Sequence, residues 1–252
     1  MENKKGQVAI FVIIATVIVA SILLFFFLRR APVGVGEASS NPEQYIEQCV
    51  GPSINEVVDI ILPQGGFRVP TSYVIYDRTI RVEYLCKNDD LRSNCINIHP
   101  MFISEISEEI KSYISPIVVS CFESLESELE KRQASVEMDN ATNISVLMTL
   151  GKVFVTIDKK VKITEKENTR TFEKFEFDVA SPIYNLASVA IDVANEERLN
   201  CYFEDFGYME RDTNVRVTRQ WMSGSTSSVY TIKDEESGKI MNIAIRSCAL
   251  TP

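Results

Sequence analysis

The stretch that decides the fold is Phe172-Glu-Lys-Phe-Glu-Phe-Asp-Val179, because from Lys174 onward its side chains alternate in polarity. Its apolar side is formed by Phe175, Phe177 and Val179, and its charged side by Lys174, Glu176 and Asp178. Successive side chains of a strand point to opposite faces. A strand with one apolar and one charged face is typical of an antiparallel sheet that packs on one side and meets water on the other.

Outward from this strand, other short runs are also rich in β-branched and aromatic residues. Upstream they are residues 144–150, 152–158 and 161–164, with residues 73–76 and 79–85 forming a hairpin around Asp77-Arg78. Downstream they are residues 201–203, 215–218, 228–232 and 240–245, with Gly238 in a turn before the last. We predict a strand in each run.

Three other segments repeat apolar residues every three or four positions, which predicts helices. They cover residues 42–62, 101–133 and 181–194. We expect Gly51-Pro52 to kink or split the first helix, and Ser115-Pro116 to divide the second, with Ser115 capping its second half. The sequence therefore predicts an α+β domain over residues 42–252, helices packed on antiparallel sheet, with a subdivision near residue 134.

Six cysteines lie in this region, dispersed and without the spacing of metal ligands. An even number of such cysteines is typical of a disulfide framework in an oxidising compartment. Fifteen pairings are open; those that we favour are Cys49–Cys121, Cys86–Cys95 and Cys201–Cys248. Asn140 and Asn143 begin two overlapping N-glycosylation sequons, which agrees with an external location. We predict an extracytoplasmic glycoprotein stabilised by disulfides.

Upstream of the domain, Val8 to Leu28 is a stretch of 21 residues without a charge, VAIFVIIATVIVASILLFFFL. As a helix it would be about 30 Å long, which matches the hydrocarbon core of a bilayer. It ends in bulky residues and Arg29-Arg30 rather than in a small-residue cleavage site, so we read it as an anchor and not as a removable secretory signal. We assign residues 7–30 to a transmembrane helix, residues 1–6 to a cytoplasmic tip or leader, and residues 31–41 to a flexible linker.

The basic residues at the two ends of this helix are nearly balanced, so they do not fix its orientation. The cysteines and sequons place the N-terminus inside the cell and the C-terminal domain outside it. Outside residues 1–30 the chain has 22 basic and 34 acidic residues, a formal charge near −12. A domain that acidic repels phosphate backbones, so we exclude nucleic acid as a partner.

Lys4-Lys5-Gly6-Gln7-Val8 resembles the class III signal sequence of archaeal type IV pilin-like surface proteins. The resemblance covers about residues 4–28 and implies cleavage between Gly6 and Gln7 by a prepilin-type peptidase, with Lys5, Gly6 and Gln7 as the processing residues. It also implies a helix that can bundle into a filament. Phe11 stands where bacterial-type pilins carry a glutamate. The alternative is that Lys4-Lys5 is a plain positive-inside flank.

Residues that could carry catalysis are scarce. The one histidine, His99, has no neighbouring Cys, Asp or His at the spacing of metal ligands and is expected to be a surface or capping residue. Glu204-Asp205 and Asp234-Glu235-Glu236 lie in expected loops, where a weak cation site is the alternative to a purely structural role. The aromatic residues near the C-terminus are expected in the core, a binding surface being the alternative; they are Tyr202, Phe203, Phe206, Tyr208, Trp221 and Tyr230. We predict no catalytic residue, no metal site, no cofactor and no enzymatic activity.

The function expected from the sequence is that of a cell-surface protein in contact with the lipid bilayer. Its ectodomain would serve assembly or adhesion through self-association or through other surface proteins. The alternative is a tethered monomeric receptor module, or an accessory subunit of a membrane complex; the linker at residues 31–41 favours this second hypothesis.

Overall fold

The computed structural model describes residue 19 and residues 41–90, 93–223 and 225–247 of the 252-residue chain. The chain divides into two compact units, Met1–Glu37 and Ala38–Pro252, and all elements given below belong to the second unit. The predicted anchor (apart from residue 19) and the predicted processing site lie outside the described residues. In the part of the chain that is described, no helix has the length and apolarity needed to cross a membrane.

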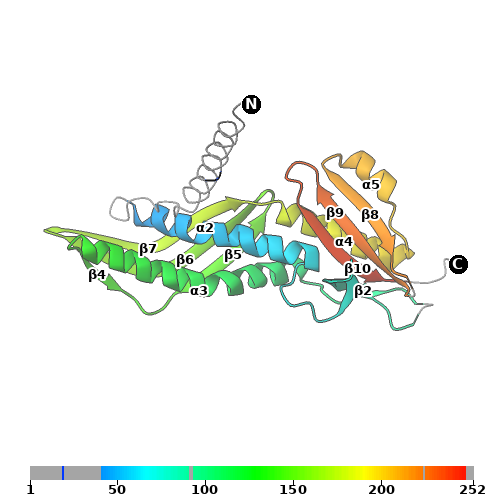
Figure 1. Ribbon diagram of the computed structural model, residues 1–252, viewed down its shortest axis with the longest axis horizontal. Helices are drawn as coiled ribbons and strands as arrows, with labels where there is room; N and C mark the ends of the chain where they lie inside the picture. Colours follow the sequence, from blue (N-terminus) through cyan, green and yellow to red (C-terminus); the bar gives the residue numbers. More distant parts are fainter. Residues whose placement is uncertain (1–18, 20–40, 91–92, 224, 248–252) are drawn as a thin grey trace, which may run out of the picture. The chain divides into compact units, whose positions relative to one another are not determined.

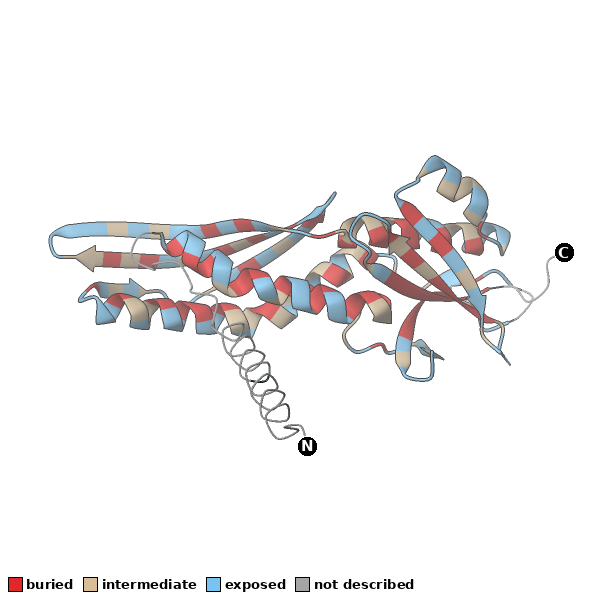
Figure 2. Cartoon of the chain, turned by 45° about the horizontal axis from the view of Figure 1, so that its top comes forward, coloured by how far each residue is buried: buried red, intermediate tan, exposed pale blue. Residues whose placement is uncertain are grey.

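The first sheet of the second unit is antiparallel. Its strands are β4 (Ser135–Met138), β5 (Asn143–Thr149), β6 (Lys152–Glu165) and β7 (Asn168–Ala180). β6 lies in the middle, with β7 along one side and both β4 and β5 along the other. In β7, Phe175 and Phe177 are buried, whereas Lys174, Glu176 and Asp178 are exposed. Figure 2 shows buried and exposed residues along the strands of this sheet. The sheet with one dry face that the sequence predicts is confirmed.

The dry face is covered by two helices, α2 (Pro42–Ile61) and α3 (Phe102–Lys131). Figure 1 shows them lying along the sheet. The two helices contact each other; in addition, α2 contacts β7, and α3 contacts β4 and β5. α2 begins where expected, because the side chain of Asn41 accepts hydrogen bonds from the backbone N–H groups of Glu43 and Gln44.

Neither of these helices is split at its proline. Pro52 and Pro116 each lie inside one continuous helix. An interior proline costs about 3 kcal/mol, but both helices bury an apolar face along their whole length, which offsets that cost. Ser115 caps nothing: its hydroxyl donates to the carbonyl of Lys111, one turn earlier, at 2.6 Å.

The second sheet contains strands from both ends of the unit. They are β1 (Tyr73–Tyr76), β2 (Ile80–Lys87), β3 (Ile96–Asn97), β8 (Val215–Trp221), β9 (Ser227–Asp234) and β10 (Ile240–Arg246). Their order across the sheet is β1-β2-β10-β9-β8, and β3 also pairs with β2. The pair β2–β10 is parallel, unlike the antiparallel pairing that was expected; the other pairs are antiparallel. Tyr76 of β1 donates a hydrogen bond to Gln220 of β8 at 3.2 Å, so side chains of the two end strands are in contact.

One face of this sheet packs on α4 (Ile183–Asn200), and the short helix α5 (Asp205–Arg211) lies against β8.

The prediction of a strand at residues 201–203 is wrong. Cys201 has a left-handed backbone, φ 57°, and ends α4, and no strand forms before α5. The 3-10 helix η1 (Leu62–Gln64) follows α2 and contacts both β2 and β10.

The larger of two hydrophobic clusters joins the two sheets. It contains, among others, Ile46 of α2, Leu125 of α3, Ile157 of β6, Val193 of α4 and Ile243 of β10. The unit is therefore α+β, with helices packed on both sheets.

Disulfides tie this core together. Cys49 and Cys121 join α2 to α3, and Cys86 and Cys95 join β2 to the segment before β3, with Cα–Cα distances of 6.0 and 5.4 Å. Both are pairings that the sequence favoured. Cys201 is disulfide-bonded too; its predicted partner, Cys248, lies outside the described residues.

Candidate interaction surface

An apolar groove of about 410 Å³ lies between β5 and the start of α3. β5 contributes Val146 and Leu147, the start of α3 contributes Met101 and Ile103, and α4 contributes Ile191. Met101 is 65% exposed and Leu147 is 61% exposed. Exposed apolar residues that gather in a concave site commonly mark a binding surface.

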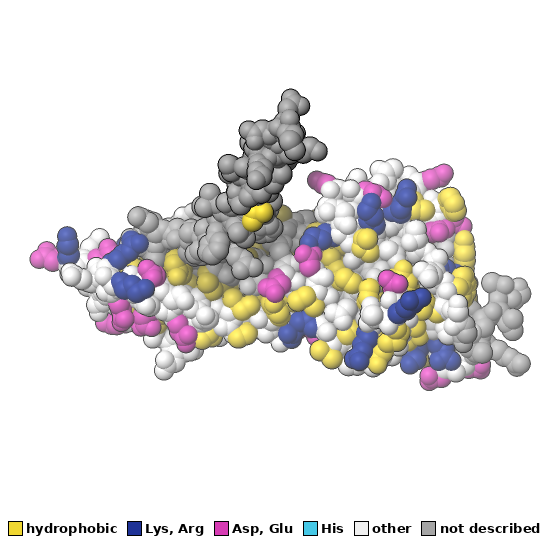
Figure 3. Space-filling model, viewed as in Figure 1, with side chains coloured by type: hydrophobic (Ala, Val, Ile, Leu, Met, Phe, Trp, Pro, Cys, Tyr) yellow, Lys and Arg dark blue, Asp and Glu magenta, His cyan; other side chains and the backbone are white. Residues whose placement is uncertain are grey.

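Away from the groove, the surface carries both apolar and charged side chains. Figure 3 shows apolar side chains interspersed with charged ones on the face that it presents. Within the groove the charged lining residue is Glu108, and Lys111 pairs with its carboxylate at 3.2 Å. The groove therefore suits an apolar or neutral partner. It could not be predicted from the sequence, because its residues come from three separate segments.

The two sequons differ in their surroundings. Asn140 is exposed in the turn between β4 and β5. Asn143 is the first residue of β5, and its amide donates to Asp158 of β6 at 3.3 Å. A glycan on Asn143 would have to displace this cross-strand hydrogen bond, so the geometry favours Asn140 as the acceptor. Glycosylation itself stays a prediction.

His99 is not the surface or capping residue that the sequence suggested. Its side chain is 14% exposed and lies between two carboxylates, with Nε2 3.4 Å from Glu83 and Nδ1 in contact with Glu105. Phe67 packs against the imidazole, with 4.6 Å between the ring centroids. Glu83 is almost fully buried and also accepts the backbone N–H groups of Thr71 and Ser72 at 2.6 and 2.8 Å.

This cluster holds four segments of the chain together: residues 67–72, β2 with Glu83, the loop with His99, and α3 with Glu105. Burial by itself would lower the pKa of His99, but the hydrogen bonds to Glu83 and Glu105 outweigh it and raise the pKa above 6.5. The imidazolium then neutralises a carboxylate that would otherwise be buried with its charge. No Ser, Thr or Cys nucleophile contacts His99 in the described segments. The arrangement is that of a structural ion cluster.

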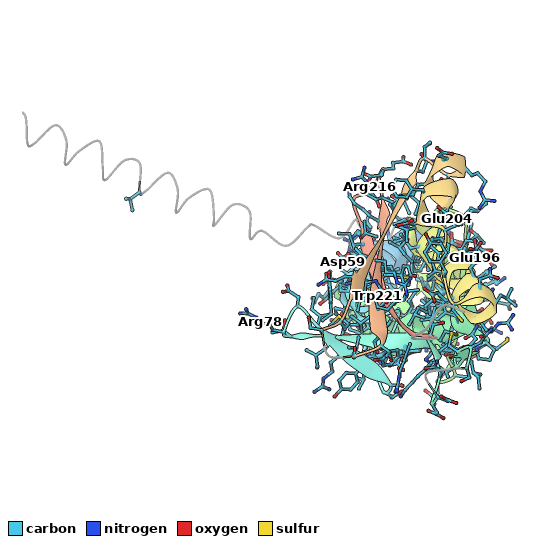
Figure 4. All side chains as sticks on the ribbon, turned by 90° about the vertical axis from the view of Figure 1, so that its right-hand side faces the viewer. Asp59, Arg78, Glu196, Glu204, Arg216 and Trp221 are labelled. Carbon is cyan, nitrogen blue, oxygen red and sulfur yellow. A yellow bond between two sulfur atoms is a disulfide. The ribbon has the colours of Figure 1, made fainter. Side chains whose placement is uncertain are left out.

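A second buried carboxylate, Glu197 on α4, was not anticipated either. Its side chain is fully buried, accepts a hydrogen bond from the Tyr230 hydroxyl and pairs with Arg219 at 3.2 Å. Burial and the nearby carboxylate raise the pKa of Tyr230. Arg219 also lies 3.9 Å from the ring centroid of Trp221, which is 58% exposed on β8 and visible at the end of the unit in Figure 4. These side chains fix α4 to the second sheet.

The aromatic residues near the C-terminus divide into two groups. Phe203 and Tyr230 are buried in the core, as expected, and their rings meet edge to face. Tyr202, Phe206 and Trp221 are exposed instead, Phe206 by 75%. The expectation of core packing is therefore wrong for these three residues.

The loop carboxylates have local structural partners. Glu204 accepts the backbone N–H of Gly207 at the start of α5, and Asp234 accepts the N–H and hydroxyl of Ser237 in the β9–β10 turn. Among residues 41–90, 93–223 and 225–247, no three potential metal ligands converge.

Comparison with known proteins adds no relative. No protein-family model, no curated protein and no solved structure matches the chain.

Proposed function

We propose that this chain is a cell-surface protein, anchored in the membrane by Val8–Leu28, whose ectodomain serves assembly or adhesion. The disulfides carry the proposal. Thiols stay reduced in most cytosols, whereas disulfides persist outside them. Cys49–Cys121 and Cys86–Cys95 are bonded across core elements, and Cys201 is bonded as well. An apolar stretch long enough for a bilayer precedes this unit.

We further propose that the N-terminus is processed as in pilin-like proteins. The support is the short motif Lys5-Gly6-Gln7 placed directly before the apolar stretch. Removal of the charged tip by a prepilin-type peptidase would leave the whole apolar helix on the mature protein. The groove between β5 and α3 then offers the ectodomain a surface for contact with other molecules. We assign the chain a binding role rather than a catalytic one.

Mass spectrometry of the N-terminus tests the processing step on protein from its native membrane. We expect a mature chain that begins at Gln7, and we expect Gly6→Leu to abolish the cleavage because the small residue before the cut is lost. Gly34→Leu is the matched control, the same change in the linker, and should be processed normally. A wild-type chain that still begins at Met1 would contradict pilin-like processing while leaving the anchor intact.

The second candidate function is a tethered monomeric binding module. The apolar groove of about 410 Å³ favours it, because a hollow of this kind can receive a segment of another protein. Stable monomers of the full-length protein in detergent, at all accessible concentrations, would favour this function over assembly.

A further inference from the structure

β5 is an edge strand. It pairs with β6 in one continuous register, from Asn143 opposite Asp158 to Thr149 opposite Lys152, and with no other strand of the described chain. Thr149 and Lys152 close a two-residue turn, so they form a hydrogen-bonded pair. Hydrogen-bonded and non-hydrogen-bonded pairs alternate along an antiparallel ladder. The odd-numbered residues of β5 therefore form the backbone hydrogen bonds to β6. Ile144, Val146 and Met148 therefore direct their backbone N–H and C=O groups to the open side.

These outward groups have no partner among the described residues. The strand also lacks the features that usually prevent edge pairing. Its sequence, NISVLMT, has neither charge nor proline, and its register with β6 has no bulge. The edge strand on the other side of the sheet, β7, carries Arg170, Glu173, Lys174, Glu176 and Asp178. The β7 edge of this sheet is thus protected by charge, whereas β5 is not.

The open side of β5 is complementary to itself. Its three outward residues are spaced evenly about Val146. In an antiparallel pair centred there, Val146 meets the partner's Val146, and Ile144 meets the partner's Met148. Each such pair forms two hydrogen bonds, so about six bonds would satisfy the outward groups on both copies.

The side chains agree with this register. Ser145 and Leu147 point to the other face of the sheet, and the same register sets Leu147 opposite the partner's Ser145. No charged side chain of β5 opposes another, which matters for a chain of net charge −9. The exposed Leu147 and the groove beside it would be shielded by the added strand.

We propose that β5 is an interface between two copies of this chain, paired antiparallel about a twofold axis centred on Val146. The inference rests on the proposed function and deepens it, because it names the surface through which ectodomains associate. Such an interface uses the same surface on both copies, so it closes as a dimer and does not by itself build a filament.

Sedimentation equilibrium of the full-length protein in detergent tests the interface. We expect a wild-type dimer whose Kd rises by about tenfold or more in Leu147→Lys, because a lysine on the edge strand opposes pairing. Leu199→Lys on α4 is the matched control, since Leu199 is 60% exposed, and should remain dimeric. A monomeric wild type, or equal Kd values for the two lysine variants, would overturn the proposal.

A crosslink tests the twofold axis and separates this dimer from one made by the membrane helix. Cα atoms in a hydrogen-bonded antiparallel pair lie about 5.5 Å apart, which suits a disulfide. Val146→Cys should therefore form a covalent dimer on mild oxidation, whereas Leu199→Cys should not. A wild-type dimer in which Val146→Cys fails to crosslink would also overturn the proposal. Neither result bears on the mass of the N-terminus, so a failure here is distinct from a failure of the proposed function.

Discussion

At the residue scale, His99 shows how a solitary titratable group can serve structure. It is the one imidazole of the chain, and its pKa is raised by hydrogen bonds to Glu83 and Glu105. A group whose pKa is higher in the folded state stabilises the fold fully below its ordinary value of 6.5. That contribution is lost as the pH rises through the folded-state pKa.

We predict that His99→Gln lowers the free energy of unfolding below pH 6.5 by about 1.5–3 kcal/mol, the range for hydrogen bonds to a charged group. The difference between wild type and variant should shrink as the pH rises, because the wild-type imidazole loses its proton. Denaturant unfolding of the full-length protein in detergent, between pH 5.5 and 9, gives the difference directly. A difference that stays constant, or grows with pH, would refute the role of the imidazolium.

The sequence could not reveal this cluster, because Glu83 lies 16 residues before His99 on another element. The same holds for Glu197 and Tyr230, which are 33 residues apart and meet only when α4 packs on β9. The sequence shows that these residues are present and that the chain has one histidine. Their convergence depends on tertiary packing, which no local pattern encodes.

At the element scale, the turn after α2 depends on Gly66. Its φ of +92° lies in the left-handed region, and a Cβ there would come within 3.0 Å of Ile106 and 3.1 Å of Phe102. Gly238 also has a positive φ, +71°, but a Cβ there would meet nothing within 4 Å.

We therefore predict that Gly66→Ala destabilises the protein by about 1–3 kcal/mol more than Gly238→Ala, since both changes carry the backbone cost and one adds a clash in the core. Thermal or denaturant unfolding of the two variants measures the difference. Equal losses of stability in the two variants would contradict the predicted clash, and would mean that α3 moves to accommodate the added methyl group.

The two described disulfides should differ in their contribution to stability. The cysteines of Cys49–Cys121 are 72 residues apart, and those of Cys86–Cys95 are 9 apart. Closing a longer loop removes more entropy from the unfolded chain, which predicts a loss of about 4 kcal/mol for the double alanine variant of the first pair and about 3 kcal/mol for the second. Denaturant midpoints under non-reducing conditions provide the comparison. A larger loss at Cys86–Cys95 would contradict this ranking.

Elements with a long, regular pattern could be predicted, and shorter ones could not. The period of apolar residues located all of α3, yet proline at position 116 suggested a break that the buried face overrides. β6 was expected as two runs and forms one strand, with an irregularity between Asp158 and Val161. α5 has seven residues and includes Gly207, so it was missed.

At the scale of the whole molecule, the α+β class followed from the sequence because runs with the strand period are grouped next to one another and one of them has a single apolar face. The pairing of β2 with β10 could not follow, since it joins strands from opposite ends of the unit in parallel. The pairing of Cys49 with Cys121 was accessible, because both fall on apolar helix faces that had to meet.

The most direct test of the account is to label intact cells with a membrane-impermeant, amine-reactive reagent and then to map the modified lysines by mass spectrometry. Lys131, at the end of α3, and Lys166, in the β6–β7 turn, are exposed on the second unit. An anchored surface protein predicts that both are labelled before lysis, and that Lys4 and Lys5, in any unprocessed chain, are labelled only after it. Lys131 and Lys166 that stay unlabelled until the cells are broken would contradict an ectodomain outside the cytoplasm.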